Sequence, residues 1–222
     1  LEDLSASART RLNTELADLT GGTDEAGDID RRDTDGILVS ENLDGRVGFE
    51  TIADAIAGQN LQNAGEQTAS PPESDAAILV EPGTYDQGPL RIETTGLTLL
   101  SREGPGETTV KSQVIAEADD VTVSGLSVSP PEPGDTQGKD EAIRVSDGAS
   151  GVTIVDNVVE DFARTKGDKK YIGVDGINIF GGDSDNPVED VAVRNNVVQR
   201  LQNPGGTEGL PGGAAGISVQ GN

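Results

Sequence analysis

One apolar phrase returns several times along this chain, and its repetition restricts the folds that the chain can adopt. It reads VTIVDNVVEDF at residues 152–162 and VAVRNNVVQRL at residues 191–201, and the two copies align position for position. Weaker copies begin at Val121 (VTVSGLSVS) and at Leu97 (LTLLSREG). The four starts lie 24 residues (97 to 121), 31 residues (121 to 152) and 39 residues (152 to 191) apart. A short alternating phrase that recurs at such spacings indicates a solenoid whose loops vary in length.

A second pattern repeats between these phrases. The triplets Ile143–Val145, Ile177–Ile179 and Ile217–Val219 are each apolar, polar, apolar, so the two outer side chains of each triplet share a face. Turns rich in Gly, Asp, Asn and Ser separate the short strands. From about residue 76 we therefore predict a parallel β-helix, in which two or three strands per turn stack about 4.8 Å apart around a dry column of Val, Ile and Leu.

Two asparagines occupy the same point of successive coils. Asn157 and Asn196 align in the two strongest copies, each directly before a Val-Val pair. We expect them at the bend between two strands, where their side-chain amides stack along the axis and form a hydrogen-bonded ladder.

The part before the repeats has a different character. Residues 1–20 carry an apolar stripe at helical spacing, which predicts an amphipathic helix that packs against a partner or caps something. The stripe consists of Leu1, Leu4, Ala8, Leu12, Leu16 and Leu19. Residues 21–36 read as a linker, and residues 49–57 (FETIADAIA) as a second short helix. We divide the chain into an arm, 1–48, and a β-helix, 49–222, with a cap at 49–57. Because the repeats stop in mid-coil, we expect the native chain to continue.

The charge restricts the setting and the partners. The chain has 40 acidic and 16 basic residues, a formal net charge of −24, spread along its length. Such self-repulsion destabilises a compact state unless salt screens it, which is typical of halophilic proteins. Disorder is the alternative before about residue 75. The charge argues against nucleic acid as a partner. No Cys is present, so no disulfide forms. The sequence contains no stretch of about 18 apolar residues, which a membrane-spanning helix would need.

The entry to the repeats resembles a known family. TIADAIA at residues 51–57, followed by ILVEPGTYD at residues 78–86, is similar to the start of right-handed parallel β-helix repeat proteins. These are the pectate-lyase-like solenoids, and the repeats resemble the NosD type found in haloarchaeal surface proteins. The resemblance implies an all-β solenoid in which a short helix caps the N-terminal end and the PGTY strand forms the first rung. That scaffold carries lyases, hydrolases, epimerases, tailspikes, adhesins and inert spacers, so it fixes no activity.

The resemblance also suggests where catalysis would occur. Lyases on this scaffold use an acidic Ca²⁺ cluster with a basic residue on an outer sheet face, and hydrolases use carboxylates on adjacent coils. The weak catalytic candidates in this chain are Asp156, Asp175, Arg144 and Arg194. Asp156 aligns with Asn195, and Arg194 is the residue before Asn195. Asp156 and Arg194 are therefore expected on neighbouring coils. The alternative interpretation is a structural Asp–Arg pair between rungs.

Two loops and two aromatic residues complete the candidate sites. GGDSDN at residues 181–186 offers Asp183 and Asp185 as ligands of a weak Ca²⁺ site, or is a solvated loop. Copper is rejected, because the chain has no His, Cys or Met. A basic loop that suits an acidic sugar or protein, or that merely balances charge, contains Arg164, Lys166, Lys169, Lys170 and Tyr171. Phe162 and Phe180 are expected to pack at coil corners.

These observations favour a non-enzymatic surface or appendage protein of a halophile, extracellular and acting in adhesion, glycan recognition or assembly. The first alternative is a carbohydrate-active enzyme, a polysaccharide lyase or glycoside hydrolase. The second is a tail-fibre or spike subunit of a virus that infects a halophile, in which the arm joins subunits into a homo-oligomer such as a trimer. The expected partners are glycans or neighbouring protein subunits, and no cofactor is expected apart from the Ca²⁺ considered above.

Overall fold

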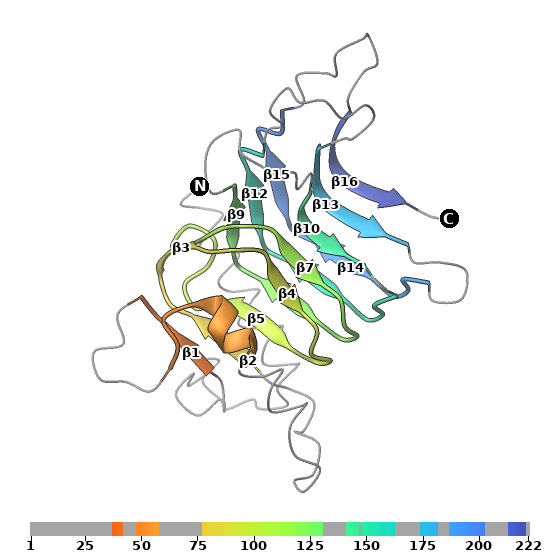
Figure 1. Ribbon diagram of the computed structural model, residues 1–222. Coiled ribbons are helices and arrows are strands. Elements are labelled where there is room, and N and C mark those ends of the chain that lie inside the picture. The colour runs from red at the N-terminus through yellow and green to blue at the C-terminus, as the bar shows by residue number, and fades with distance from the viewer. Residues whose placement is uncertain are drawn as a thin grey trace, which may run out of the picture.

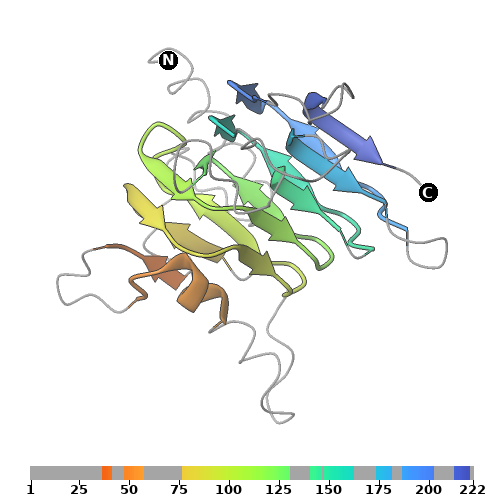
Figure 2. The same cartoon turned by 45° about the horizontal axis from the view of Figure 1, so that its top comes forward.

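The chain winds into a parallel β-helix, as the repeats predict, and the helix is right-handed, as the resemblance implies (Figure 1). The computed structural model describes residues 37–41, 48–57, 77–130, 141–146, 148–162, 174–181, 187–202 and 213–220. Their strands form three parallel sheets, and each complete turn contributes one strand to every sheet. Figure 2 shows the turns stacked from the yellow first coil to the blue last coil. The predicted all-β solenoid is therefore confirmed, and parallel crossovers of this kind are right-handed in almost all proteins.

The three sheets are named A, B and C here. Sheet A contains β1 (Ile37–Val39), β2 (Ala77–Val80), β5 (Thr98–Ser101), β8 (Thr122–Ser124), β11 (Thr153–Val155) and β14 (Ala192–Arg194). Sheet B contains β3 (Gly83–Asp86), β6 (Thr108–Lys111), β9 (Ser127–Ser129), β12 (Val158–Glu160) and β15 (Val197–Gln199). Sheet C contains β4 (Leu90–Ile92), β7 (Val114–Ala116), β10 (Glu141–Val145), β13 (Val174–Phe180) and β16 (Ala214–Gln220).

The core is a set of aliphatic columns that run along the axis. In sheet A, Leu99 pairs with Val123 and Val123 with Ile154, and all three side chains are fully buried. Val110 and Val128 of sheet B continue the same arrangement. Each inward residue meets its counterpart on the next rung, about 4.8 Å away, which excludes water without large aromatic side chains.

The corner between sheets A and B explains the repeated asparagines. Its first residue has a positive φ in three successive coils: 68° at Gly125, 56° at Asp156 and 54° at Asn195. The next residue points inward, and there Asn157 is fully buried. Asn157 Nδ2 donates to Oδ1 of Asn196 at 3.1 Å, and Oδ1 of Asn157 accepts from the Leu126 amide at 3.0 Å. The side chains thus satisfy backbone groups that a sharp corner leaves without ladder partners.

A short helix at residues 52–57 packs on the first coil. Ile52, Ala55 and Ile56 are buried in the core, and the Thr51 hydroxyl oxygen accepts from the Asp54 amide at 3.0 Å, as a helix N-cap does. Before this helix, β1 pairs in parallel with β2. Sheet A therefore includes one strand from the segment that we assigned to the arm. The helix predicted for residues 1–20 lies outside the described residues.

Three of the long connections share one corner. The three loops that interrupt the coils, residues 130–140, 161–173 and 200–213, each lead from sheet B to sheet C. In the first two coils this corner takes only residues 87–89 and 112–113. Most of the inserted length therefore precedes strands of sheet C, and one further long connection, residues 181–191, leads from sheet C to sheet A. None of the helical segments that the structure describes has the length and apolar character needed to cross a membrane.

Candidate functional site

The outer face of sheet C is built by a five-residue pattern that repeats on three strands. β10, β13 and β16 contain EAIRV, DGINI and AGISV at residues 141–145, 175–179 and 215–219, paired in register. The second and third residues of the pattern both face the core. Ala142 and Ile143 are fully buried, and a Cβ on Gly176 would lie 2.3 Å from Cγ1 of Val198 in sheet B. Two consecutive inward residues interrupt the alternation as a β-bulge does, so the first and fourth residues point outward.

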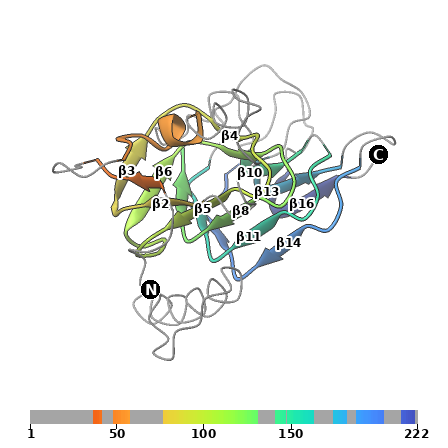
Figure 3. The same cartoon turned by 90° about the horizontal axis from the view of Figure 1, so that it is seen from below.

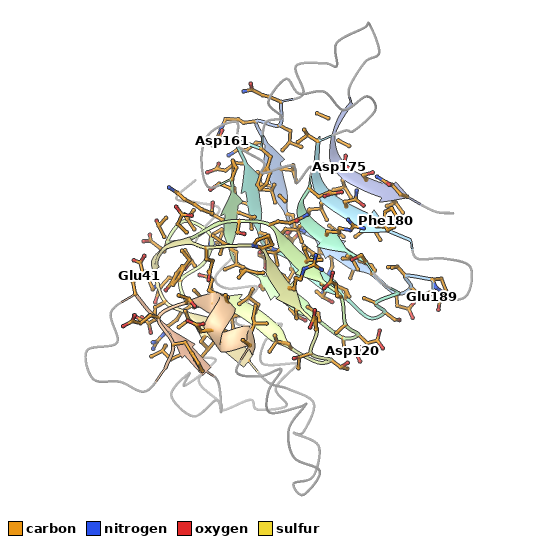
Figure 4. The ribbon with its side chains drawn as sticks, in the orientation of Figure 1. Glu41, Asp120, Asp161, Asp175, Phe180 and Glu189 are labelled. Carbon is orange, nitrogen blue, oxygen red and sulfur yellow. The ribbon has the colours of Figure 1, made fainter. Side chains whose placement is uncertain are left out.

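Two outward rows result, and together with their neighbours they form what we call the sheet C site. It comprises Gln113, Glu141, Arg144, Asp175, Asn178, Phe180 and Ser218. Figure 4 shows Asp175 and Phe180 towards opposite ends of β13. Because parallel rungs lie about 4.8 Å apart, residues from three coils come within reach of one bound molecule.

Two carboxyl groups lie side by side in the first row. Glu141 pairs in register with Asp175, and Oε2 of Glu141 accepts from Gln113 Nε2 at 3.2 Å. Oδ2 of Asp175 accepts from Asn178 Nδ2 at 2.9 Å, and the carboxyl group also accepts from the Ser218 hydroxyl. Burial raises the pKa of Asp175 above its ordinary value of 3.8, and the two hydrogen bonds only partly oppose this. Asp175 therefore keeps its proton to a higher pH than an exposed aspartate.

The second row combines a cation, an amide and an aromatic ring. The guanidinium carbon of Arg144 lies 4.6 Å from the centre of the Phe180 ring, a cation–π contact. Phe180 is 40% exposed, so one part of its ring faces solvent. Asn178 pairs in register with Arg144 and is 1% exposed.

Several buried polar atoms of this face have no hydrogen-bond partner. Within the described part of the chain these include Gln113 Oε1, Arg144 Nε and Asn178 Oδ1. Native structures contain few such atoms, and each calls for an explanation. Three of them on one face indicate a place where a bound molecule or ordered water completes the hydrogen bonding.

The four catalytic candidates fall in two separate places. Arg144 and Asp175 lie in the sheet C site. Asp156 and Arg194 lie at the corner after sheet A, where the Asp156 amide donates to the carbonyl of Arg194 at 3.2 Å. These two residues are on neighbouring coils, as the alignment indicated, but they belong to another face of the solenoid.

The other candidate residues have different outcomes. The expected Ca²⁺ ligands and the basic loop lie outside the described residues; these are Asp183, Asp185, Arg164, Lys166, Lys169, Lys170 and Tyr171. Among the residues that are described, no group of three or more acidic side chains has an arrangement that could hold a metal ion. Phe162 is buried in the core at 2% exposure, whereas Phe180 is not packed in a corner. The expectation for Phe180 was wrong, because its side chain points away from the core.

Sequence reasoning missed most of the sheet C site. Glu141, Gln113, Asn178 and Ser218 were not selected, although a signal was present. The polar middle residue of each Ile-x-Val/Ile triplet recurs on one face, and an acidic residue occurs two positions before the first Ile in the triplets of β10 and β13. Only the bulge, which the sequence does not reveal by itself, brings that acidic residue to the same face.

Comparisons with known proteins add solved structures of low similarity. No protein-family model and no curated protein matches the chain. A pectin methylesterase in complex with a hexasaccharide is 13% identical with a TM-score of 0.42, and the alignment covers 84% of this chain and 66% of that protein. A pectin methylesterase from Erwinia chrysanthemi is 15% identical with a TM-score of 0.36, over 71% of this chain and 52% of that protein. A pectin methylesterase from Aspergillus niger is 16% identical with a TM-score of 0.35, and the alignment covers 85% of this chain and 87% of that protein.

This chain spans less than two thirds of the length of the first two of these proteins. The β-helix assignment rests on the strand order and register of the chain itself.

Proposed function

We propose that this protein binds glycans through the outer face of sheet C. The observation that carries the proposal is the in-register row of polar side chains, Glu141 beside Asp175 and Arg144 beside Asn178, next to a half-exposed aromatic ring. A row of this kind repeats hydrogen-bonding groups along the axis of a rigid scaffold. An extended chain of hydroxyl-bearing rings presents a matching series of donors and acceptors.

The chemistry of each group suits a sugar. Carboxyl oxygens accept from sugar hydroxyls, and the amide of Asn178 offers both a donor and an acceptor. The apolar face of a sugar ring can stack on the Phe180 ring, and the contact with Arg144 holds the Phe180 ring in place. Because Arg144 offsets part of the charge of the two carboxyl groups, neutral oligosaccharides are the ligand class that we propose.

The setting of this activity belongs to the same proposal. The net charge of −24 supports a halophilic environment, since salt at molar concentration screens the self-repulsion. In that setting the protein would act outside the cell or on a virion, as a surface or appendage subunit that recognises glycans.

Titration calorimetry at molar salt, with a panel of neutral and uronic-acid oligosaccharides, tests the proposal. The wild type is expected to bind at least one neutral oligosaccharide. Phe180→Ala is expected to lower that affinity at least tenfold, which corresponds to about 1.4 kcal/mol. Thr109→Ala, on the outer face of sheet B, is the matched control and is expected to bind as the wild type does. No binding to any neutral oligosaccharide, or an equal loss in both variants, would refute the sheet C site.

A carbohydrate-active enzyme is the second candidate, and the raised pKa of Asp175 favours it. Two neighbouring carboxyl groups, one of them with a raised pKa, are a pair that glycosidic hydrolysis can use. In this mechanism Asp175 gives its proton to the leaving oxygen, and Glu141 removes a proton from the attacking water. Chain cleavage would be followed for the wild type, Asp175→Asn and Glu141→Gln. Cleavage that both substitutions abolish supports the enzyme, whereas binding without cleavage leaves the recognition function alone.

A further inference from the structure

The outer face of sheet A carries a row of side chains that are buried although they point away from the core. In β5, Leu99 lies in the core, so the next residue, Leu100, points to the opposite face. Val155 follows Ile154 of the core in the same way. The register places six residues in one row across the sheet, namely Leu38, Leu79, Leu100, Ser124, Val155 and Arg194. The four middle residues are buried, whereas Leu38 is partly buried and Arg194 is exposed. We call this the sheet A row, and Figure 3 shows most of its strands in order.

The burial of this row is unusual for the outside of a solenoid. Leu79 is 8% exposed, Leu100 3%, Ser124 1% and Val155 4%. Thr98, Thr122 and Thr153, which face outward on the same strands, are only partly buried. Every described strand belongs to one of the three sheets, so no described strand lies across the row. The low exposure of the apolar side chains Leu79, Leu100 and Val155 is therefore not explained by any described strand.

We propose that the amphipathic segment 1–20 of the same chain docks as a helix along the sheet A row. Its six apolar positions, from Leu1 to Leu19, recur every three or four residues and so form one stripe on a helix. A helix this short is marginal in water alone and gains its stability from packing an apolar face. The sheet A row is the apolar surface that such a stripe matches.

A helix formed by residues 1–20 is long enough to cover the whole sheet A row. Leu1 and Leu19 are 18 residues apart, which is about 27 Å along a helix. The whole row crosses five strand spacings, about 24 Å, and its buried part, from Leu79 to Val155, crosses three, about 14 Å. Residues 1–20 also precede β1 in the chain, and β1 is the first strand of sheet A. The intervening residues 21–36, at up to about 3.3 Å each, reach any point of that face.

The composition of the other long segments makes them poor covers. Residues 58–76 contain one leucine, Leu61, among Gln, Asn, Ser, Glu and Pro, and cannot supply a stripe. The connections 131–140, 163–173 and 203–212 leave from the corner between sheets B and C, away from this face. Only residues 1–20 combine repeated leucines with helical spacing.

Photo-crosslinking in the full-length chain tests the docking. The chain has no Cys, so Thr153→Cys gives a single thiol beside Val155, which is then labelled with a benzophenone maleimide. Thr122→Cys reports from the neighbouring strand in the same way. After irradiation at molar salt, peptide mapping is expected to find the crosslink within residues 1–20 of the same molecule, in a band of monomer size. Thr109→Cys, on the outer face of sheet B, is expected to give no crosslink to this segment.

A second variant separates docking from general proximity. Leu12→Glu with Leu16→Glu places charges in the middle of the stripe and is expected to reduce the crosslink from Thr153→Cys at least tenfold. Circular dichroism should show the solenoid still folded. An unchanged crosslink in this double variant would overturn the proposal. So would mapping of the crosslink to another segment, or to a second copy of the chain in a dimer band.

Discussion

Replacing Asn157 with alanine should destabilise the solenoid more than any exposed substitution. Asn157 is fully buried at the corner between sheets A and B. Its Nδ2 donates to the carbonyls of Val123 and Val155, both at 3.0 Å, and to Asn196, and its Oδ1 accepts from the Leu126 amide. In the alanine variant the Leu126 amide is left buried without this acceptor, and the carbonyls lose a donor.

The magnitude follows from these contacts. One buried donor without a partner costs about 1–3 kcal/mol, and each lost neutral hydrogen bond about 0.5–1.5 kcal/mol. We therefore expect Asn157→Ala to lower the free energy of unfolding by about 3 kcal/mol. This is a large fraction of the roughly 5–15 kcal/mol that holds a typical domain together. Urea unfolding at constant molar salt, followed by circular dichroism, measures the change.

Asn196→Ala is the matched control, because its side chain makes the same kinds of bond one coil further on. Asn196 Nδ2 donates to the carbonyls of Ile154 and Arg194, at 2.8 and 2.9 Å. Asn196 is only partly buried, so water can replace the bonds of its Nδ2. The amide of the buried Asn157 still loses its acceptor, Asn196 Oδ1 at 3.0 Å, and we expect a loss of about 2 kcal/mol. A loss below about 1 kcal/mol for Asn157→Ala, or a larger loss for Asn196→Ala, would refute the reasoning.

Three further predictions test other parts of the structure. Since the folded-state pKa of Asp175 is raised, the folded protein binds this proton more tightly, and the free energy of unfolding should fall as pH rises just above 3.8. Urea titrations of the wild type and of Asp175→Asn should show this fall in the difference between their free energies of unfolding. A difference that does not change with pH would contradict the prediction. Burial raises the pKa of Tyr85 to about 12 from 10.0, so stability should fall between those values as pH rises, and Tyr85→Phe should remove that part of the alkaline loss. Gly176→Ala should lower the free energy of unfolding by about 1–3 kcal/mol, because the new Cβ meets Val198 Cγ1, whereas Gly88→Ala, with no atom within 4 Å, should leave it nearly unchanged.

The repeats predict the coils because inward and outward residues alternate strictly in the short strands. Val123 and Ile154 are identifiable as core residues from the period of two alone, and they pair in register. Asn157 and Asn196 are recognisable for a similar reason. An asparagine whose side chain bonds the backbone at a corner recurs at the same corner of each coil that is stabilised in this way.

Other features depend on contacts that are distant in the sequence. β1 has only three residues, and its partner Ile78 is 41 positions after Ile37, so no local signal marks it as a strand. The outward position of Phe180 depends on the bulge at Gly176. If residues alternated strictly from the buried Val174, residue 180 would point inward. Gly176 and Ile177 both face the core, so the alternation shifts by one residue and Phe180 points outward.

The position of the sheet C site along the axis also bears on what it can do. Its outward rows span β10, β13 and β16, and the last of these holds Ser218 between two apolar residues that are largely exposed, Ile217 at 53% and Val219 at 75%. On β13 the equivalent residues, Ile177 and Ile179, are buried. β10 and β13 each pair with a strand of sheet C on both sides, so the side chains of Glu141, Asp175 and Asn178 are held firmly. Replacing any of these three residues should therefore weaken binding.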